Sequence, residues 1–368
     1  MIMRNIEEKF NGCDFVVRLE KERKNTKIKL LQLTDMQIID SFQRRTPDRL
    51  RIDEINSWNP AHFDEQCGDG IRSLVAQTNP DLIFITGDII YGSFDDNGTT
   101  FEWFVNFMDS LEIPWAPVFG NHDNESLKGV QWQCQKFADS KFCLFKRGNV
   151  SGNGNYTVGI AVEDELIRVL HMIDSNGCGE SDDPEIIKEE GIFPDQIELI
   201  KENTLKIKEA QKKEVPAFIA FHIPTIEFFE AEKSKGYVKD EYDFYTLGVN
   251  VTPKDGDFGT KRELYKQENI VKGEYLQHFK DCGIDGVFVG HCHSINTCIL
   301  YEGIKWVFGL KTGQYDYHIP YAVGGTLITL EDKDFYVSHV PCLVNCTNFP
   351  IDMRMFKGFF ADDKKIIE

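Results

Sequence analysis

The sequence has few basic residues, no long apolar run and no paired cysteine motif. Its 41 lysines and arginines are outnumbered by 60 aspartates and glutamates, which gives a formal net charge of −19. Nucleic acids and anionic membranes repel a protein of this charge, so we expect neither as a partner. No window approaches the roughly 18 consecutive apolar residues of a membrane-spanning helix, and residues 1–8 lack the apolar core of a signal peptide.

The ten cysteines are scattered along the chain, and none forms a C-x-x-C pair. A chain of 368 residues can bury a large core without disulfides, so reduced thiols are the simplest interpretation. Reduced thiols and the missing signal peptide together predict a cytoplasmic protein.

The sequence shows no internal repeat and no low-complexity linker, so we expect one domain across residues 1–368, with its core at about 28–340. Hydrophobic residues make up 41% of the chain and aromatic residues 12%, as in ordered globular proteins. Residues 231–268 have few periodic signals, which predicts an insertion or a lid. The tail after residue 341 predicts an irregular extension.

Short apolar runs alternate with amphipathic segments along much of the chain. The predicted strands are 15–20, 27–34, 81–86, 113–119, 156–161, 167–173, 217–221 and 286–289. The predicted helices are 63–77, 101–111, 126–137, 194–212 and 274–281. This βαβαβ rhythm predicts a parallel sheet with its polar residues gathered at one edge. The last predicted strands form an antiparallel meander, at 297–301, 305–309, 325–330 and 335–339.

Five of the predicted strands end in residues that can bind metals. These are Asp35 with Gln37, Asp88, Asn121 with His122, His222, and His291 with His293. One strand-end histidine is more often a core residue, and one strand-end Asn or Asp more often caps a turn or helix. Five such ends at one edge of an α/β sheet indicate a shared site instead. If residues 35–37 are extended, Asp35 and Gln37 point to the same side.

A site for two metal ions explains these residues together. Two cations about 3.5–4 Å apart need a shared anionic ligand, and Asp88 is the natural bridge because one carboxylate can neutralise both charges. The coordination shell of one ion would be completed by Asp35, Gln37 and His293. The shell of the other ion would be completed by Asn121, His222 and His291. Oxygen and imidazole donors without cysteine favour Mn, Fe or Zn over Ca or a structural zinc.

The order of these motifs resembles the calcineurin-like metallophosphoesterase superfamily across about residues 28–340. The motifs are Asp-x-Gln at 35–37, Gly-Asp at 87–88, Gly-Asn-His-Asp at 120–123, the strand-end His222 and Gly-His-x-His at 290–293. Residues 221–228 and 288–296 are similar to the purple-acid-phosphatase-like branch, which includes stand-alone phosphatase domains. The resemblance implies a four-layer α/β/β/α sandwich with two mixed β-sheets.

The resemblance also implies a reaction, the hydrolysis of a phosphate monoester of a small substrate. A hydroxide that bridges the two cations attacks the phosphorus in line. His122 stabilises or protonates the leaving oxygen, and Asp123 orients His122. The sequence indicates no oligomeric state.

Two departures from the family pattern leave alternatives open. Most members have His where this chain has Gln37, and Asp-x-Gln also occurs in a branch that cleaves ADP-ribose and related pyrophosphates. A phosphodiesterase or nucleotide pyrophosphatase is therefore the alternative. Tyr91 has the spacing of the tyrosinate that binds ferric iron in purple acid phosphatases, although packing is the more frequent role of such a tyrosine. A catalytically inactive scaffold is a third interpretation, which the retained ligands disfavour.

Some residues near the strand ends have two possible roles. Arg44, Arg45, Arg49 and Arg51 follow the Asp-x-Gln motif, and they would either hold an anionic substrate or pair with surface acids. Ser175, Asn296 and residues 315–317 would either line the pocket or form turns.

Overall fold

The computed structural model describes most of the chain and places two β-sheets face to face. The described residues are 1–4, 6–20, 27–40, 43, 63–178, 181–240, 242–248, 256–263, 275–314, 316–319, 322–331 and 334–342. The arginine-rich segment at 44–51 and the predicted extension beyond residue 342 lie outside these ranges. Within the described residues, no helix has the length and apolar character needed to cross a membrane.

The smaller sheet has five strands in the order β15-β14-β3-β4-β5. Its parallel part consists of β3 (Ile28–Leu33), β4 (Leu82–Thr86) and β5 (Trp115–Val118). The edge consists of antiparallel β14 (Gly324–Glu331) and β15 (Asp334–Pro341). The helices that follow the parallel strands are α2 (Phe63–Thr78), α3 (Thr99–Ser110) and α4 (Val130–Asp139). The predicted βαβαβ unit is confirmed.

The larger sheet has eight strands in the order β1-β2-β6-β7-β8-β11-β13-β12. They are β1 (Ile2–Met3), β2 (Phe15–Leu19), β6 (Tyr156–Val162), β7 (Glu165–Met172), β8 (Ala217–Ala220), β11 (Ile284–Val289), β12 (Cys298–Tyr301) and β13 (Ile304–Phe308). The helices on this side are α5 (Pro194–Gln211), α6 (Ile226–Ser234) and α7 (Leu276–Asp281). The sheet contains both parallel and antiparallel pairs, which makes it mixed.

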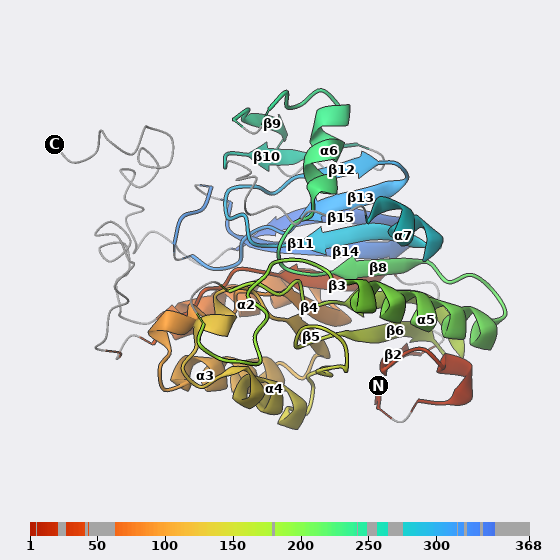
Figure 1. Ribbon diagram of the computed structural model, residues 1–368, viewed down its shortest axis with the longest axis horizontal. Coiled ribbons are helices and arrows are strands. Elements are labelled where there is room, and N and C mark those ends of the chain that lie inside the picture. The colour runs from red at the N-terminus through yellow and green to blue at the C-terminus, as the bar shows by residue number, and fades with distance from the viewer. Residues whose placement is uncertain are drawn as a thin grey trace.

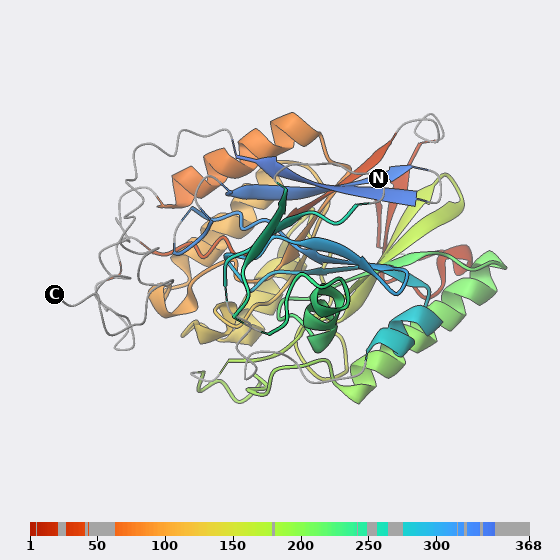
Figure 2. The same ribbon diagram turned by 90° about the horizontal axis from the view of Figure 1, so that it is seen from above.

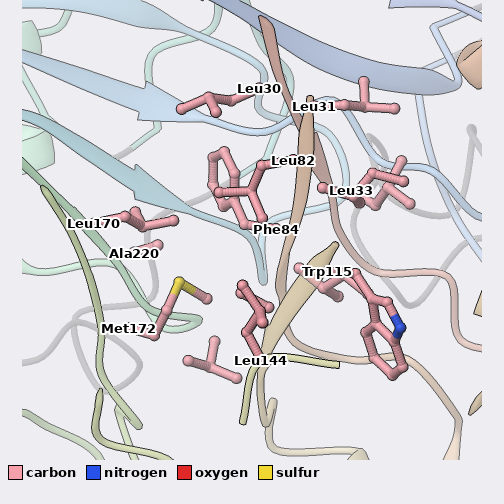
Figure 3. Close-up of a cluster of buried hydrophobic side chains, with 14 of the residues drawn as sticks. Leu30, Leu31, Leu33, Leu82, Phe84, Trp115, Leu144, Leu170, Met172 and Ala220 are labelled. Atoms are coloured by element: carbon pink, nitrogen blue, oxygen red, sulfur yellow. The ribbon is translucent and has the colours of Figure 1, made fainter. Parts of the chain in front are cut away.

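Apolar side chains from both sheets form the central core (Figure 3). Phe84 of β4 packs edge-on against Phe288 of β11, with ring centroids 5.4 Å apart. A second apolar cluster joins the other face of the larger sheet to α5, α6 and α7. Helices α2 and α5 consequently lie on opposite sides of the strands (Figures 1 and 2). The predicted α/β class with two mixed sheets between helical layers is confirmed.

The predicted antiparallel pairs β12–β13 and β14–β15 are confirmed, but a continuous meander is wrong, because the two pairs lie in different sheets. Strand β13 joins the larger sheet beside β11, whereas β14 pairs with β3 in the smaller one. Residues 309–323 cross between the sheets, and the backbone N–H groups of Thr312 and Gly313 donate to the carbonyl oxygens of Thr34 and Asp35. The segment that crosses between the sheets is therefore hydrogen-bonded to the chain at the end of β3.

Two further segments differ from the sequence prediction. The helix predicted from residue 126 begins at Val130, and a short 3₁₀ turn at Asp123–Glu125 precedes it. The described part of 231–268 contains the end of α6 and a hairpin of β9 (Tyr245–Gly248) and β10 (Gly259–Lys261). Whether this segment acts as a lid remains a prediction.

Candidate metal centre

The seven predicted ligands lie together at the carboxyl ends of β3, β4, β5, β8 and β11. A continuous series of close contacts links them all. The side chain of Asp88 lies 3.2 Å from that of Gln37 and 3.3 Å from that of His222. Asn121 lies 3.1 Å from His222 and 3.0 Å from His291. The backbone N–H of His291 donates to Asp35 at 3.1 Å, and the Asp35 carboxylate lies 3.5 Å from His293. The structure therefore brings all seven side chains into one buried cluster.

Four donor atoms in this cluster are joined by four contacts of the length found between ligands of one ion. His222 Nε2 lies 3.3 Å from Asp88 Oδ1, 3.1 Å from Asn121 Oδ1 and 3.3 Å from His291 Nδ1. Asn121 Oδ1 lies 3.0 Å from His291 Nδ1. Ligands at about 2.0–2.1 Å from a tetrahedral ion are separated by about 3.3 Å, so this donor set fits a transition metal. We call these four residues site B.

The imidazole of His222 is held in the tautomer that a metal ligand needs. Its Nδ1 lies 2.7 Å from the carbonyl oxygen of Thr86, which only accepts, so Nδ1 carries a hydrogen and Nε2 faces the cluster. Burial opposes a charge on this ring, yet Asp88 and Asp35 raise the pKa of His222 to about 9. Burial and the neighbouring His222 lower the pKa of His291 to about 3. The carboxylates thus attract positive charge into the cluster.

Asp35, Asp88 and His293 form the other side of the centre, which we call site A. One donor atom from each residue lies within 4.8 Å of the others. His293 Nδ1 lies 3.4 Å from Asp316 Oδ2, and its Nε2 lies 3.5 Å from Asp35 Oδ1. The Tyr317 ring packs on His293 with centroids 4.3 Å apart. Sequence reasoning placed residues 315–317 near the pocket, although Tyr315 is outside the described residues and Asp316 was not singled out.

Gln37 contacts a residue that the sequence did not suggest. Lys311 Nζ donates to Gln37 Oε1 (3.1 Å) and to the carbonyl oxygen of Asp35 (2.8 Å), while Gln37 Nε2 donates to Asp88 Oδ2 (3.2 Å). Lys311 is buried, and burial lowers its pKa. A lone lysine in a loop normally indicates exposed surface, so no sequence signal pointed to it.

The backbone around the ligands departs from the extended conformation expected at residues 35–37. The φ angles of Asp35, Gln37, Asp88 and His291 are 51°, 47°, 52° and 72°, values that non-glycine residues seldom adopt. The extended expectation is therefore wrong, and tight turns aim these side chains. A side chain at Gly120 would overlap Asp88 Oδ1, so only glycine allows β4 and β5 to end this close together. Such strained positions are frequent at functional sites.

His122 lies at the edge of site B, and its partner is Glu125. His122 Nδ1 lies 2.8 Å from Glu125 Oε1, and its backbone N–H donates to Asp88 Oδ1. Tyr91 stacks on the imidazole with centroids 4.1 Å apart. The expectation that Asp123 orients His122 is wrong, because the 3₁₀ turn brings Glu125 under the ring instead.

Asp123 stabilises the turn that carries the ligands. Its two carboxylate oxygens accept the backbone N–H groups of Ile90 (3.0 Å) and Gly120 (2.8 Å). Burial and the nearby Asp88 raise the pKa of Asp123 to about 7. Asp123 therefore joins the end of β4 to the end of β5, and its structural role is to fix the loop.

The model of the calcineurin-like phosphoesterase family matches residues 28–294, which include every one of these ligands. The chain belongs to the calcineurin-like phosphoesterase family. This family is dinuclear and metal-dependent, in agreement with the donor set described above.

The named relatives of this chain are distant in sequence. Probable inactive purple acid phosphatase 14 of Arabidopsis thaliana is 22% identical, over 83% of this chain and 76% of the relative. Phosphatase DCR2 of Saccharomyces cerevisiae is 25% identical, over 76% of this chain and 46% of the relative. A dimetal phosphatase from Danio rerio has a TM-score of 0.48 at 10% identity, over 85% of this chain and 96% of the other.

Two residues that the sequence suggested for the pocket, Ser175 and Asn296, bind backbone N–H groups instead. Ser175 Oγ accepts the N–H groups of His222 (3.3 Å) and Ile223 (2.9 Å), which fixes the end of β8. Asn296 Oδ1 accepts the N–H of Thr260 at 2.7 Å. Both residues have the turn roles that sequence analysis gave as their alternative. A role of Tyr91 as a ligand stays a prediction.

Proposed function

We propose that this chain is a phosphoesterase that hydrolyses phosphate monoesters of small molecules with the help of two Mn, Fe or Zn ions. The observation that carries the proposal is the set of four contacts of 3.0–3.3 Å that link the donor atoms of site B. Without a cation, two imidazole nitrogens and two oxygens would have little reason to converge. Asp35, Gln37, Asp88, Asn121, His222, His291 and His293 are the proposed ligand set.

The charges of the cluster suit cations. Although burial opposes ionisation, His222 and His122 hold the pKa of Asp88 well below its usual range. His293 and His222 likewise lower the pKa of Asp35 against the effect of burial. Both carboxylates are therefore anionic at neutral pH. When bound, the cations would supply a strongly acidified water and neutralise the phosphoryl oxygens.

The chain's own residues then position the substrate and move the proton. The His122 side chain is 18% exposed, whereas those of His222 and Asp88 are 0% and 1% exposed. Like Asn121 and His291, His122 is thus partly exposed and can reach a substrate from solvent. With Nδ1 held by Glu125, Nε2 is the ring nitrogen that would donate a proton to the leaving oxygen.

The family and the names of relatives support a phosphatase. The yeast relative carries the name phosphatase, but the Arabidopsis relative is named as probably inactive. We favour an active enzyme because this chain keeps the buried ligands and the oriented His122. Gln37 favours a second candidate, a phosphodiesterase or nucleotide pyrophosphatase at the same site, because the same residue stands in the Asp-x-Gln branch.

Metal analysis and substrate comparison test the proposal directly. Purified protein is stripped of metal, reloaded with Mn, Fe, Zn or Mg, and assayed on p-nitrophenyl phosphate, bis-p-nitrophenyl phosphate and ADP-ribose. We expect metal-dependent cleavage with preference for p-nitrophenyl phosphate, and loss of that activity in His122→Ala with metal content retained. Preference for either of the other substrates would select the second candidate. No cleavage with any metal would leave the inactive scaffold.

A further inference from the structure

Lys311 lies under site A, in the segment that crosses between the two sheets. It is 2% exposed, and its Nζ donates to the carbonyl oxygen of Asp35 and to Gln37 Oε1. The carbonyl oxygen of Asp35 also accepts the N–H of Gly313 at 3.2 Å, so it has a hydrogen-bond partner without Lys311. A need to satisfy this carbonyl in the fold therefore does not account for the buried lysine. Burying an amine is costly, so its contact with Gln37 calls for another explanation.

The two partners of Gln37 fix the direction of its amide. When charged, Lys311 can only donate, so the atom that faces it must be the amide oxygen. The ionised Asp88 can only accept, so the atom that faces Oδ2 must be the NH₂ group. The opposite orientation would place NH₂ against the amine and two oxygens against each other. A neutral lysine could also accept a hydrogen bond, but the ionised Asp88 alone still requires the NH₂ group at its Oδ2.

An amide held in this direction cannot bind a metal at site A. The amide NH₂ group has no lone pair available for a cation, and the oxygen is turned away toward Lys311. The NH₂ group also occupies Oδ2 of Asp88, the carboxylate shared by both sites. Site A then keeps three ligands, Asp35, Asp88 and His293, whereas site B has four donors linked by contacts of 3.0–3.3 Å.

We propose that Lys311 is a positioning residue that makes the metal centre asymmetric. By holding Gln37 in a direction in which it is not a ligand, Lys311 weakens the binding of the ion at site A and leaves the ion at site B tightly bound. This inference rests on the proposed dimetal centre, and it changes the role of Gln37 from ligand to hydrogen-bond donor.

Calorimetric titration of the metal-free full-length chain with Mn²⁺ tests the proposal. We expect one tight ion and a second that binds about 10- to 100-fold more weakly, the range over which residues behind a ligand change metal affinity. In Lys311→Met the amide can turn its oxygen toward the ion, so the second affinity should rise at least about tenfold with the first nearly unchanged. Lys29→Met is the matched control, because Lys29 also donates to a backbone carbonyl, that of Thr78, near the far end of β3.

Gln37→Glu provides a second, independent variant. It keeps the shape of the side chain but replaces NH₂ by an oxygen that can bind the ion, so the second ion should again bind at least about tenfold more tightly. If circular dichroism shows that Lys311→Met does not fold, this variant decides alone. Two equally tight ions in the wild type, or an unchanged ratio in the folded variants, would overturn the role of Lys311. No ion bound to the wild type at all would instead overturn the proposed metal-dependent function.

Discussion

Glu125, and not Asp123, is the carboxylate that contacts the imidazole of His122. The Nδ1 to Oε1 distance is 2.8 Å, and the other oxygen, Oε2, accepts both the N–H and the O–H of Ser93. Glu125 is thereby fixed by a turn of a neighbouring loop. A carboxylate in this position favours the protonated imidazole, which is the form that donates to a leaving oxygen.

We predict that Glu125→Gln slows turnover by about 10- to 100-fold with little change in KM, because it keeps the shape but removes the charge that favours protonated His122. The basic limb of the pH–rate profile should move to lower pH by roughly one unit. Steady-state kinetics across pH measure both effects.

Asp123→Asn is the matched control for this prediction. It should lower stability by about 1–3 kcal/mol, because one of two buried N–H groups loses its acceptor, but it should leave the basic limb in place. If the basic limb of the pH–rate profile shifts in Asp123→Asn but not in Glu125→Gln, then Asp123 orients His122 and Glu125 does not.

The ligands could be predicted from sequence because each follows an apolar strand, and parallel strands end at a common edge. Their supports could not be predicted in the same way. Gln37 and Lys311 are 274 residues apart, and only the crossing between the two sheets brings them into contact. Glu125 is three residues from His122, but a helix expected from residue 126 concealed the 3₁₀ turn that makes the contact.

Helices and strands were predictable where a local sequence pattern determines them. The division of the last four strands between two sheets was not predictable in this way. Strands β14 and β15 alternate between buried and partly buried residues, as members of one meander with β12 and β13 would. The choice between the sheets depends instead on distant partners, Val287 for Trp306 of β13 and Leu30 for Ile328 of β14. Such long-range pairing leaves no mark in a short window of sequence.

We predict that Asp88→Asn lowers the affinity for both ions, because Asp88 is the only proposed ligand shared by sites A and B. The loss should be about tenfold or more for each ion, since an amide supplies no negative charge. Metal content after desalting measures it. Asp109→Asn is a suitable control, because Asp109 bonds Ser140 and Trp115 away from the centre and should retain both ions. Retention of both ions by Asp88→Asn would contradict the bridging role.

We predict that Tyr91 acts by packing on His122 and not by binding iron. Tyr91→Phe keeps the stacked ring and should therefore turn over within about threefold of the wild type, whereas Tyr91→Leu removes the ring and should be slower by tenfold or more. Iron-loaded wild type should show no purple charge-transfer band. A band that disappears in Tyr91→Phe would assign the phenolate to iron and refute the packing role.

We predict that acid weakens the fold partly through His171, which is buried on β7. The Asn203 side chain donates to Thr157 Oγ1, which also lies 3.3 Å from His171 Nδ1. Burial lowers the pKa of His171 from 6.5 to about 4. As the pH falls, His171 therefore takes up a proton in the unfolded chain before it does so in the folded protein. The contribution of His171 to the free energy of unfolding is complete above pH 6.5 and is lost as the pH falls toward 4.

The loss attributed to His171 is about 2 kcal/mol at pH 5. Urea unfolding at pH 7 and pH 5, with EDTA to remove metal, compares the wild type with His171→Asn. The variant should be less stable at pH 7, because it packs less well, but its free energy of unfolding should fall by about 2 kcal/mol less between the two pH values. Metal ligands titrate equally in both proteins and cancel in the comparison. An identical pH dependence would show that His171 is protonated in the folded state as readily as in the unfolded chain.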